Sequence, residues 1–435
     1  DDPDYVARVM SALEGEHSFD RKRERIDEYG WRHFGDLYGD HENAGDPALT
    51  RISHYNNQYD AVAGFAIQYF RTGDTRWLEP MEDLARHVID IDIYHTDEDK
   101  AAYNHGLFWH TAHHVEAGTA THRTYSRDAG GGSGGPSSEH NYTTGLMLYY
   151  FMTGDEPARQ AVVELADWVI AMDDGSLTPL KWITKAPTGL ASATGSYAYH
   201  GPGRGPGNGI VALLNAHRLT GAPRFIAKAD ELIRRCVHPN QDIPALNLLD
   251  AERRWFYTVF LQALGRYLDI KLEADERDVM YTYVRKTLLA YARWMAEHEY
   301  PYLDKPEILQ HPTETWAAQD MRKCDVFLCA SAHASDRERN RFLERSDFFF
   351  SSSLSQLRQM PTSSYTRPTV VMLTNGYRRA YVRTHPDVYA PPAKATVDFG
   401  EPGTFRPQKQ VAARRIFTLA VSGLDRKSTR LNSSH

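Results

Sequence analysis

Apolar residues recur at helical spacing along most of the chain, in paired segments joined by Thr-Gly turns. Residues 58–74, QYDAVAGFAIQYFRTGD, align with residues 139–155, EHNYTTGLMLYYFMTGD, and Gly64 then falls on Gly145. A third copy, GNGIVALLNAHRLTGAP, covers residues 207–223. A second amphipathic segment follows each turn, at 77–91, 158–172 and 224–236. The repeat therefore predicts a helix, a turn that stops at glycine, and a second helix.

Weaker copies extend the repeat to about six hairpins. They pair residues 254–270 with 279–295 and residues 315–335 with 337–357, and the N-terminal segment 4–15 supplies a further helix. Tandem helical hairpins build either a solenoid or a closed ring. The repeat periods are irregular and long polar loops separate the copies, which favours closure. We therefore expect an all-α fold, an (α/α)6 toroid over residues 1–385.

Composition narrows the function classes. The 435 residues carry a net charge of −7, so a broad nucleic-acid-binding surface is not expected. No apolar run reaches the roughly 18 residues that cross a bilayer, and no signal peptide opens the chain. Three cysteines do not make a disulfide framework. The 25 Tyr, 8 Trp and 20 His suit a carbohydrate site, although a large aromatic core accounts for at least half of them.

Polar residues head the first helix of each strong repeat. In a toroid these helix starts gather at one end, the mouth, where free N–H groups and helix dipoles favour anionic ligands. Asp60, Asn141 and Asn208 occupy equivalent positions, where capping and ligand binding are equally good interpretations. Glu139, His140 and Tyr142 exceed what capping alone requires.

Two polar loops flank the second repeat. The first, 103–142, contains a Gly-rich run that we interpret as a mobile flap over the mouth. The second, 194–208, carries Tyr197. Its glycine-rich string is not a phosphate loop, because no Gly-Lys-Ser/Thr sequence follows it. His110 and His113 share a helix face and are the alternative metal pair, although no acidic partner completes a zinc motif. The chemistry-bearing side chains of the two loops are His105, Trp109, His110, His113, His122, Arg123, Tyr125, His140, Tyr199, His200 and Arg204.

Several stretches of the N-terminal half together resemble a known family. They are YGWRHFGDLYGDHE, HYNNQYDAVAGFAIQYFRTGDTRW, DLARHVIDIDIYHTDEDKAAYNHGLFWHT, THRTYSR and GGPSSEHNYTTGL. This set resembles the C-terminal α/α-toroid domain of the PcRGLX/YetA-like proteins, which include exo-acting rhamnogalacturonan lyases. The resemblance is strongest over 29–155 and fades by about residue 244. It implies cleavage of pectic rhamnogalacturonan by β-elimination, and it carries over no catalytic set.

β-Elimination at a uronate needs a neutralised carboxylate, a base for the C5 proton and an acid for the leaving oxygen. We expect His140 as the base, Tyr199 or Tyr125 as the acid, and Arg123 with Asn57 as the neutralising groups. No cofactor is required by this chemistry, and a bound metal is a minor alternative. The expected partner is an acidic polysaccharide or oligosaccharide, without nucleic acid or membrane. The expected substrate-binding residues are Tyr55, Asp60, His105, Trp109, His110, His122, Glu139, Asn141, Tyr142, His200, Arg204 and Asn208.

Two other functions remain open from the sequence. A glycoside hydrolase releasing a terminal uronic acid needs two carboxylates about 5–10 Å apart, and Asp60 with Glu139 head adjacent inner helices. A non-catalytic sugar-binding toroid would keep aromatic residues such as Tyr55, Trp109 and Trp182 without a paired acid and base.

The C-terminal pattern differs from the repeats. Residues 386–424 alternate in short apolar segments and suggest the start of an incomplete β-rich domain. Residues 425–435, DRKSTRLNSSH, match the translation of a common sequencing-adapter string, so we expect them not to be native. The source would then be an environmental bacterium, and the compartment stays open between secreted, periplasmic and cytoplasmic.

Overall fold

The computed structural model describes residues 2–25, 29–33, 36–38, 52–54, 57–108, 136–385 and 397–432. This part of the chain is predominantly helical. Its one sheet is a two-stranded antiparallel ribbon, in which Leu37 of β1 (Asp36–Tyr38) pairs with Ser53 of β2 (Ile52–His54). The all-α prediction is confirmed for the described residues.

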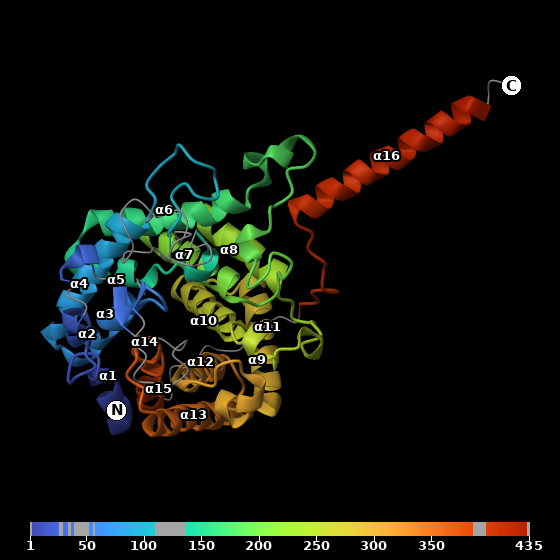
Figure 1. The fold of residues 1–435 in the computed structure, drawn as a ribbon. Coiled ribbons are helices and arrows are strands. Elements are labelled where there is room, and N and C mark those ends of the chain that lie inside the picture. The colour runs from blue at the N-terminus through green and yellow to red at the C-terminus, as the bar shows by residue number, and fades with distance from the viewer. Residues whose placement is uncertain are drawn as a thin grey trace.

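Among the described residues, six inner helices form a closed ring, whose arrangement can be followed in Figure 1. They are α3 (Ala61–Thr72), α5 (Thr144–Thr153), α7 (Arg204–Thr220), α10 (Tyr257–Glu273), α12 (Glu314–Ser331) and α14 (Thr366–Thr374). Each contacts the next, and α14 contacts α3, which closes the ring. The closure of the toroid therefore rests on helix-to-helix contacts of this chain itself.

An outer helix packs on each inner helix. The outer helices are α4 (Leu78–His87), α6 (Glu156–Asp173), α8 (Pro223–Cys236), α11 (Val279–His298), α13 (Asp336–Gln359) and α1 (Pro3–Met10). The first five follow their inner partners in sequence, as the repeat predicts. The sixth hairpin joins the two ends of the toroid, because α1 packs against α14. Four further helices are α2 (Phe19–Arg25), α9 (Ala251–Arg254), α15 (Arg378–Thr384) and α16 (Gln408–Asn432).

The predicted Thr-Gly turns end three inner helices as left-handed caps. Gly73, Gly154 and Gly221 have φ of 69°, 73° and 66°, a region that glycine enters without steric cost. Each glycine N–H donates to the carbonyl oxygen four residues earlier, which satisfies one of the open carbonyls of the helix end. The chain then turns directly into the outer helix.

The hydrophobic core lies between the two rings. Its largest fully buried side chains include Trp77, Trp168, Tyr257 and Tyr267. The inner helix α12 departs from this apolar pattern, since it is buried along almost its whole length and yet carries five charged residues. One of them, Lys323, forms ion pairs with Glu299 at 2.7 Å and Asp320 at 3.0 Å. Buried charged side chains usually need an ion-pair partner. A charged residue of α12 that has no such partner therefore needs another explanation.

Two local expectations are wrong. Helix α5 begins at Thr144 and not at Glu139, because Ser138–His140 forms a separate 3-10 turn and the cap of α5 comes from another helix. Residues 408–424, expected to belong to the start of a β-rich domain over 386–424, lie in α16. Figure 1 shows α16 projecting away from the ring, where the described chain offers no strand to pair with, so backbone groups bond within a helix. No helix among the described residues is long and apolar enough to span a membrane.

Candidate active site

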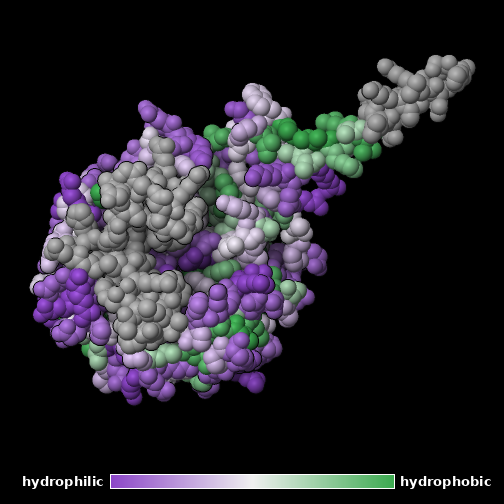
Figure 2. Space-filling view, viewed as in Figure 1, coloured by the Kyte–Doolittle hydropathy of each residue, from purple (hydrophilic) through white to green (hydrophobic). Residues whose placement is uncertain are grey.

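A cavity of about 370 Å³ lies inside the ring of inner helices. Figure 2 shows hydrophilic atoms in the hollow at the centre of the molecule. The polar side chains that line it come from every inner helix or its flanking turn. They are Tyr59, Asp60, Asn141, Tyr142, Thr143, Thr144, Asn208, Asn215, Arg218, Gln262, Arg266, Asp269, Glu273, Arg322, Asp325, Thr374, Asn375, Tyr377 and Arg378.

Asp60 ties two inner helices together at the mouth. Its carboxylate accepts hydrogen bonds from the N–H of Ala63 in α3 and from the N–H groups of Thr144 and Gly145 in α5, at 3.1–3.3 Å. The Asn57 side chain accepts from the Val62 N–H at 3.0 Å and completes this cap. Burial raises the pKa of Asp60, while Arg266 and these hydrogen bonds oppose the shift. Asn57 and Asp60 therefore have a structural role in holding α3 and α5 together.

The chain leading into this cap is strained. Tyr59 and Asp60 have φ of 62° and 64°, a left-handed region that residues other than glycine rarely adopt. Two such residues in succession persist only where the surroundings hold them, and such strain is common at functional sites. Here the strain places the Tyr59 ring in the wall of the cavity.

Arg322 is a buried cation in the cavity wall. Its side chain donates to the amide oxygens of Gln319 at 2.7 Å and Gln262 at 3.1 Å. No described carboxylate lies within ion-pairing distance of it, and burial lowers the pKa of its guanidinium. The guanidinium lies 5.2 Å from the ring centroid of Tyr59.

Tyr142 lines the same cavity as Arg322. Burial raises the pKa of its phenol, and the positive charges of Arg204 and Arg322 oppose this shift. The phenol is therefore protonated at neutral pH and available as a proton donor. The neighbouring Asn141 donates to the Leu165 carbonyl at 3.2 Å, and its Oδ1 is buried without a hydrogen-bond partner among the described residues.

Asp325 follows Arg322 by three residues, so both lie on one face of α12. The Asp325 carboxylate accepts from the Gly376 N–H at 3.1 Å and is 4% exposed. Burial raises its pKa to about 6, against the lowering effects of Arg378 and the Gly376 hydrogen bond. At neutral pH it is ionised and can accept a proton, which is the state that a general base needs.

Glu139 holds the loop before α7 against the turn before α5. Its carboxylate accepts from Arg204 at 2.5 Å and from the Gly195 N–H at 2.7 Å. Asn208 donates to the Glu139 carbonyl at 2.7 Å. Burial disfavours the charge of Arg204, but the Glu139 carboxylate outweighs it and raises the pKa of Arg204. Glu139 is therefore committed to an ion pair and does not line the cavity.

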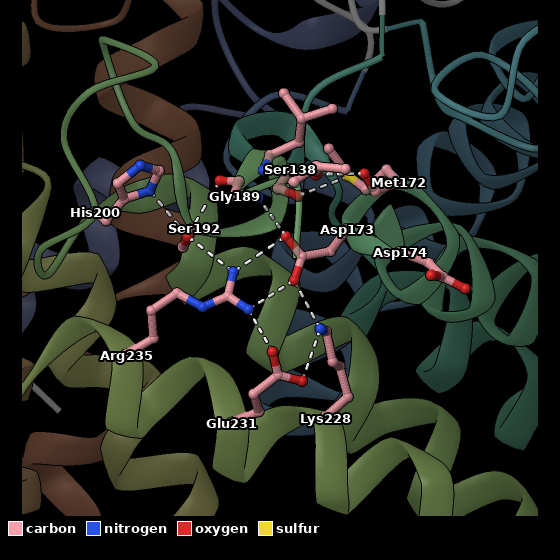
Figure 3. Close-up of polar contacts among 12 residues, drawn as sticks. Ser138, Met172, Asp173, Asp174, Gly189, Ser192, His200, Lys228, Glu231 and Arg235 are labelled. Atoms are coloured by element: carbon pink, nitrogen blue, oxygen red, sulfur yellow. Dashed lines mark hydrogen bonds and ion pairs between the residues drawn. The ribbon is translucent and has the colours of Figure 1, made fainter. Parts of the chain in front are cut away.

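His200 belongs to a polar network that connects residues 189–200 with α6 and α8 (Figure 3). Its Nδ1 lies 3.0 Å from the Ser192 hydroxyl, which also accepts from Arg235 at 3.1 Å. Arg235 and Lys228 pair with the buried Asp173, which also accepts from the Gly189 N–H at 2.9 Å. Although burial opposes it, this pairing lowers the pKa of Asp173. The network anchors residues 189–200 to α6 and α8.

Three other predicted residues, His140, Tyr199 and His105, lie outside the cavity lining. His140 is buried next to the cavity and packs edge-on against Tyr142, with ring centroids 6.3 Å apart, but it does not line the cavity. Tyr199 donates to Pro202 O at 3.3 Å and packs under Arg254. His105 bonds Asp97 and Glu164 outside the ring. The remaining predicted residues lie outside the described residues: Tyr55, Trp109, His110, His113, His122, Arg123 and Tyr125.

Sequence reasoning missed Tyr59, Arg322 and Asp325. A signal for the last two exists in the sequence, because α12 reads ETWAAQDMRKCDVFLCAS, with charges in the middle of a segment that the repeat assigns to an inner, buried helix. Charges at buried positions are rare unless they pair or bind something. Among the described residues, no group of His, Cys, Asp and Glu has the arrangement of a metal site.

The comparisons with known proteins leave the family open. No family model and no curated protein matches the chain. Among solved structures, it is similar to a cellobiose 2-epimerase from Spirochaeta thermophila, with a TM-score of 0.39 and 11% identity over 83% of this chain and 85% of that chain. A similarity of this size carries no information about reaction or substrate. The resemblance to the PcRGLX/YetA-like proteins therefore stays a prediction.

Proposed function

We propose that the chain is a carbohydrate-active enzyme that cleaves a pectic, rhamnogalacturonan-type polysaccharide by β-elimination in the central cavity. The observation that carries the proposal is Arg322, a buried cation in the wall of a polar cavity whose hydrogen-bond partners among the described residues are two side-chain amides. A buried charge of this kind is costly without an anion, and a uronate carboxylate supplies one. The adjacent Tyr142 and Asp325 supply an acid and a base.

Arg322, Asp325 and Tyr142 each carry out one part of the elimination. Arg322 and the Gln262 amide hold the uronate carboxylate and spread the charge that develops when C5 loses its proton. Asp325 takes that proton, the C5–H electrons form the C4–C5 double bond, and the C4–O bond breaks. Tyr142 protonates the leaving oxygen. Water then returns the proton from Asp325 to Tyr142, so no water is consumed and the groups are restored.

His140 has a different role here from the one expected from the sequence. It contacts the Tyr142 ring from behind, so we assign it to orienting Tyr142. Asn208 and Asn141 line the cavity near Tyr142 and offer amide groups to sugar hydroxyls.

A hydrolase is the second candidate, because Asp60 and Asp325 both line the cavity and burial raises the pKa of both carboxyls. The Asp60 carboxylate is already used by three backbone N–H groups, which argues against it as an acid.

Kinetics of two arginine variants test the proposal. Arg322→Gln should lower kcat/KM on a pectic substrate by about 10²-fold or more, the loss typical of one group that stabilises developing charge. Arg218→Gln is the matched control, because Arg218 lines the cavity but is ion-paired with Glu273. Equal activity of both variants and the wild type would contradict the assigned role of Arg322.

A further inference from the structure

Four arginines are among the described residues that line the cavity, and they divide into two kinds. Arg218 pairs with Glu273, and Arg378 pairs with Asp269 at 3.0 Å. Arg322 and Arg266 have no described carboxylate within ion-pairing distance. Arg322 is the cation to which we assign the uronate at the cleavage point, and Arg266 remains without an assigned ligand.

Arg266 lines the cavity further along α10 than Gln262, the residue of that helix that contacts Arg322. Gln262, which accepts from Arg322, is four residues before Arg266 on α10, so the two positions are about 6 Å apart along the helix axis. The Arg266 guanidinium donates to the Thr144 hydroxyl at 2.7 Å, at the first residue of α5. Asn215 of α7 donates to the same hydroxyl at 3.2 Å. Three inner helices thus bring a guanidinium, a hydroxyl and an amide to one level of the cavity.

The nearby carboxylates do not occupy this guanidinium. Asp60 accepts from the backbone N–H groups that start α3 and α5, and Asp325 accepts from the Gly376 N–H and faces Gln262. The negative charges of Asp60 and Asp325 interact electrostatically with Arg266, but neither carboxylate accepts a hydrogen bond from its guanidinium. A guanidinium presents a planar pair of donors that fits a carboxylate or a sulfate.

We propose that Arg266, with Thr144 and Asn215, forms a second anion subsite that takes a second acidic group of the same saccharide, one helical turn beyond the Arg322 subsite. This inference rests on the proposed function and narrows its substrate class to saccharide chains with at least two anionic sugars. An otherwise neutral chain with one terminal uronate would occupy only the Arg322 subsite. The shared chemistry is a compact oxyanion, either a uronate carboxylate or a sulfate ester.

Calorimetric binding to the Tyr142→Phe variant tests the subsite without turnover. The probes are short pectic oligosaccharides with one uronate, the same chains with two uronates, and one-uronate chains that carry a sulfate ester at the second position. The second anionic group should tighten binding at least about tenfold, the gain expected from one charge-assisted pair. Whichever second group gives the gain identifies the chemistry of the subsite.

The added Arg266→Gln change should abolish that gain and leave affinity for the one-uronate chain within about twofold, since it removes one charge-assisted contact. Arg266→Lys should restore part of the gain, and Arg218→Gln should keep it in full. A gain that survives Arg266→Gln would overturn the second subsite while leaving the proposed function intact. Absence of binding to every uronate chain would overturn both. A melting curve for each variant verifies that it is folded.

Discussion

The carboxylate of Asp60 and the backbone N–H of Gly145 are joined by a hydrogen bond of 3.1 Å that links the starts of two inner helices. The two helices approach so closely here that a Cβ on Gly145 would lie 2.4 Å from the Ala63 nitrogen and 2.7 Å from Asp60 Oδ1. The glycine that the repeat aligns with Gly64 is therefore required by contact between the helices, not by its own φ.

Gly145→Ala should destabilise the protein by about 3 kcal/mol, the upper end of the usual cost of overpacking, because the nearest atom, the Ala63 nitrogen, belongs to the backbone. The control is Gly209→Ala in α7, where the nearest atom to the added Cβ lies at an ordinary 3.5 Å. Chemical denaturation measures both. Similar free energies of unfolding for the two variants would show that α3 and α5 do not meet as described.

Tyr142→Phe should reduce kcat by about 10²- to 10⁴-fold with little change in fold, since it removes only the proposed proton donor. Tyr150→Phe is the control, because Tyr150 lies on α5, the helix that follows Tyr142, and is outside the cavity lining. Steady-state rates on a pectic substrate and melting curves give the two readouts. A Tyr142→Phe enzyme with more than about a tenth of the wild-type rate would rule out general acid catalysis by this phenol.

His140→Gln separates the sequence-based role from the structural one. If His140 orients Tyr142, the variant should lose less activity than Tyr142→Phe, because the proton donor is still present. If His140→Gln loses as much activity as Tyr142→Phe and keeps its fold, His140 would instead be assigned as the base, as the sequence suggested.

Asp325→Asn should abolish turnover and yet stabilise the protein at neutral pH. The folded-state pKa of about 6 lies above the ordinary 3.8, so the folded state binds the proton more tightly than the unfolded state. The penalty for the buried carboxylate is then complete above pH 6 and fades as the pH falls through 6 towards 4. Two pKa units correspond to about 3 kcal/mol. The stabilisation of the variant should therefore be near 3 kcal/mol at pH 8 and small at pH 4.

Denaturation of wild type and Asp325→Asn at the two pH values measures this difference, with the exposed Asp242→Asn as the control. A stabilisation that is the same at pH 4 and pH 8 would contradict the raised pKa. Catalytic groups commonly cost stability, so a gain in stability with a loss of turnover would be the expected pattern for a base.

The C-terminal segment offers a fifth test. Removal of residues 425–435 should leave the melting temperature unchanged, because Figure 1 shows α16 projecting from the ring. Gln408→Ala, at the start of the same helix, should cost about 1–3 kcal/mol, since the buried amide donates to the carbonyls of Gly175 and Thr184. A drop of several degrees on removal of 425–435 would show that the segment packs.

The repeat made the fold predictable because each hairpin carries its own helical periodicity and the three strongest copies end their first helix at a glycine. The closure through α1 and α14 was less visible, since the two helices are separated by the whole toroid in sequence. The sites of Asp60, Asn141, Tyr142 and Asn208 near the cavity could be expected from their shared place at or just before the start of an inner helix. The charges in the middle of α12 mark Arg322 and Asp325 as unusual in the sequence, but only the three-dimensional register shows that both face the cavity.

The reaction products test the central claim most directly. The wild-type protein is incubated with rhamnogalacturonan and other uronate polysaccharides in heavy-oxygen water, and the products are followed by ultraviolet absorbance and mass spectrometry. The account predicts an unsaturated uronate at the new non-reducing end, with ultraviolet absorbance and no oxygen from the solvent incorporated at the cleavage point. Products without that chromophore that carry one solvent oxygen per cleaved bond would contradict β-elimination and assign the cavity to a hydrolase.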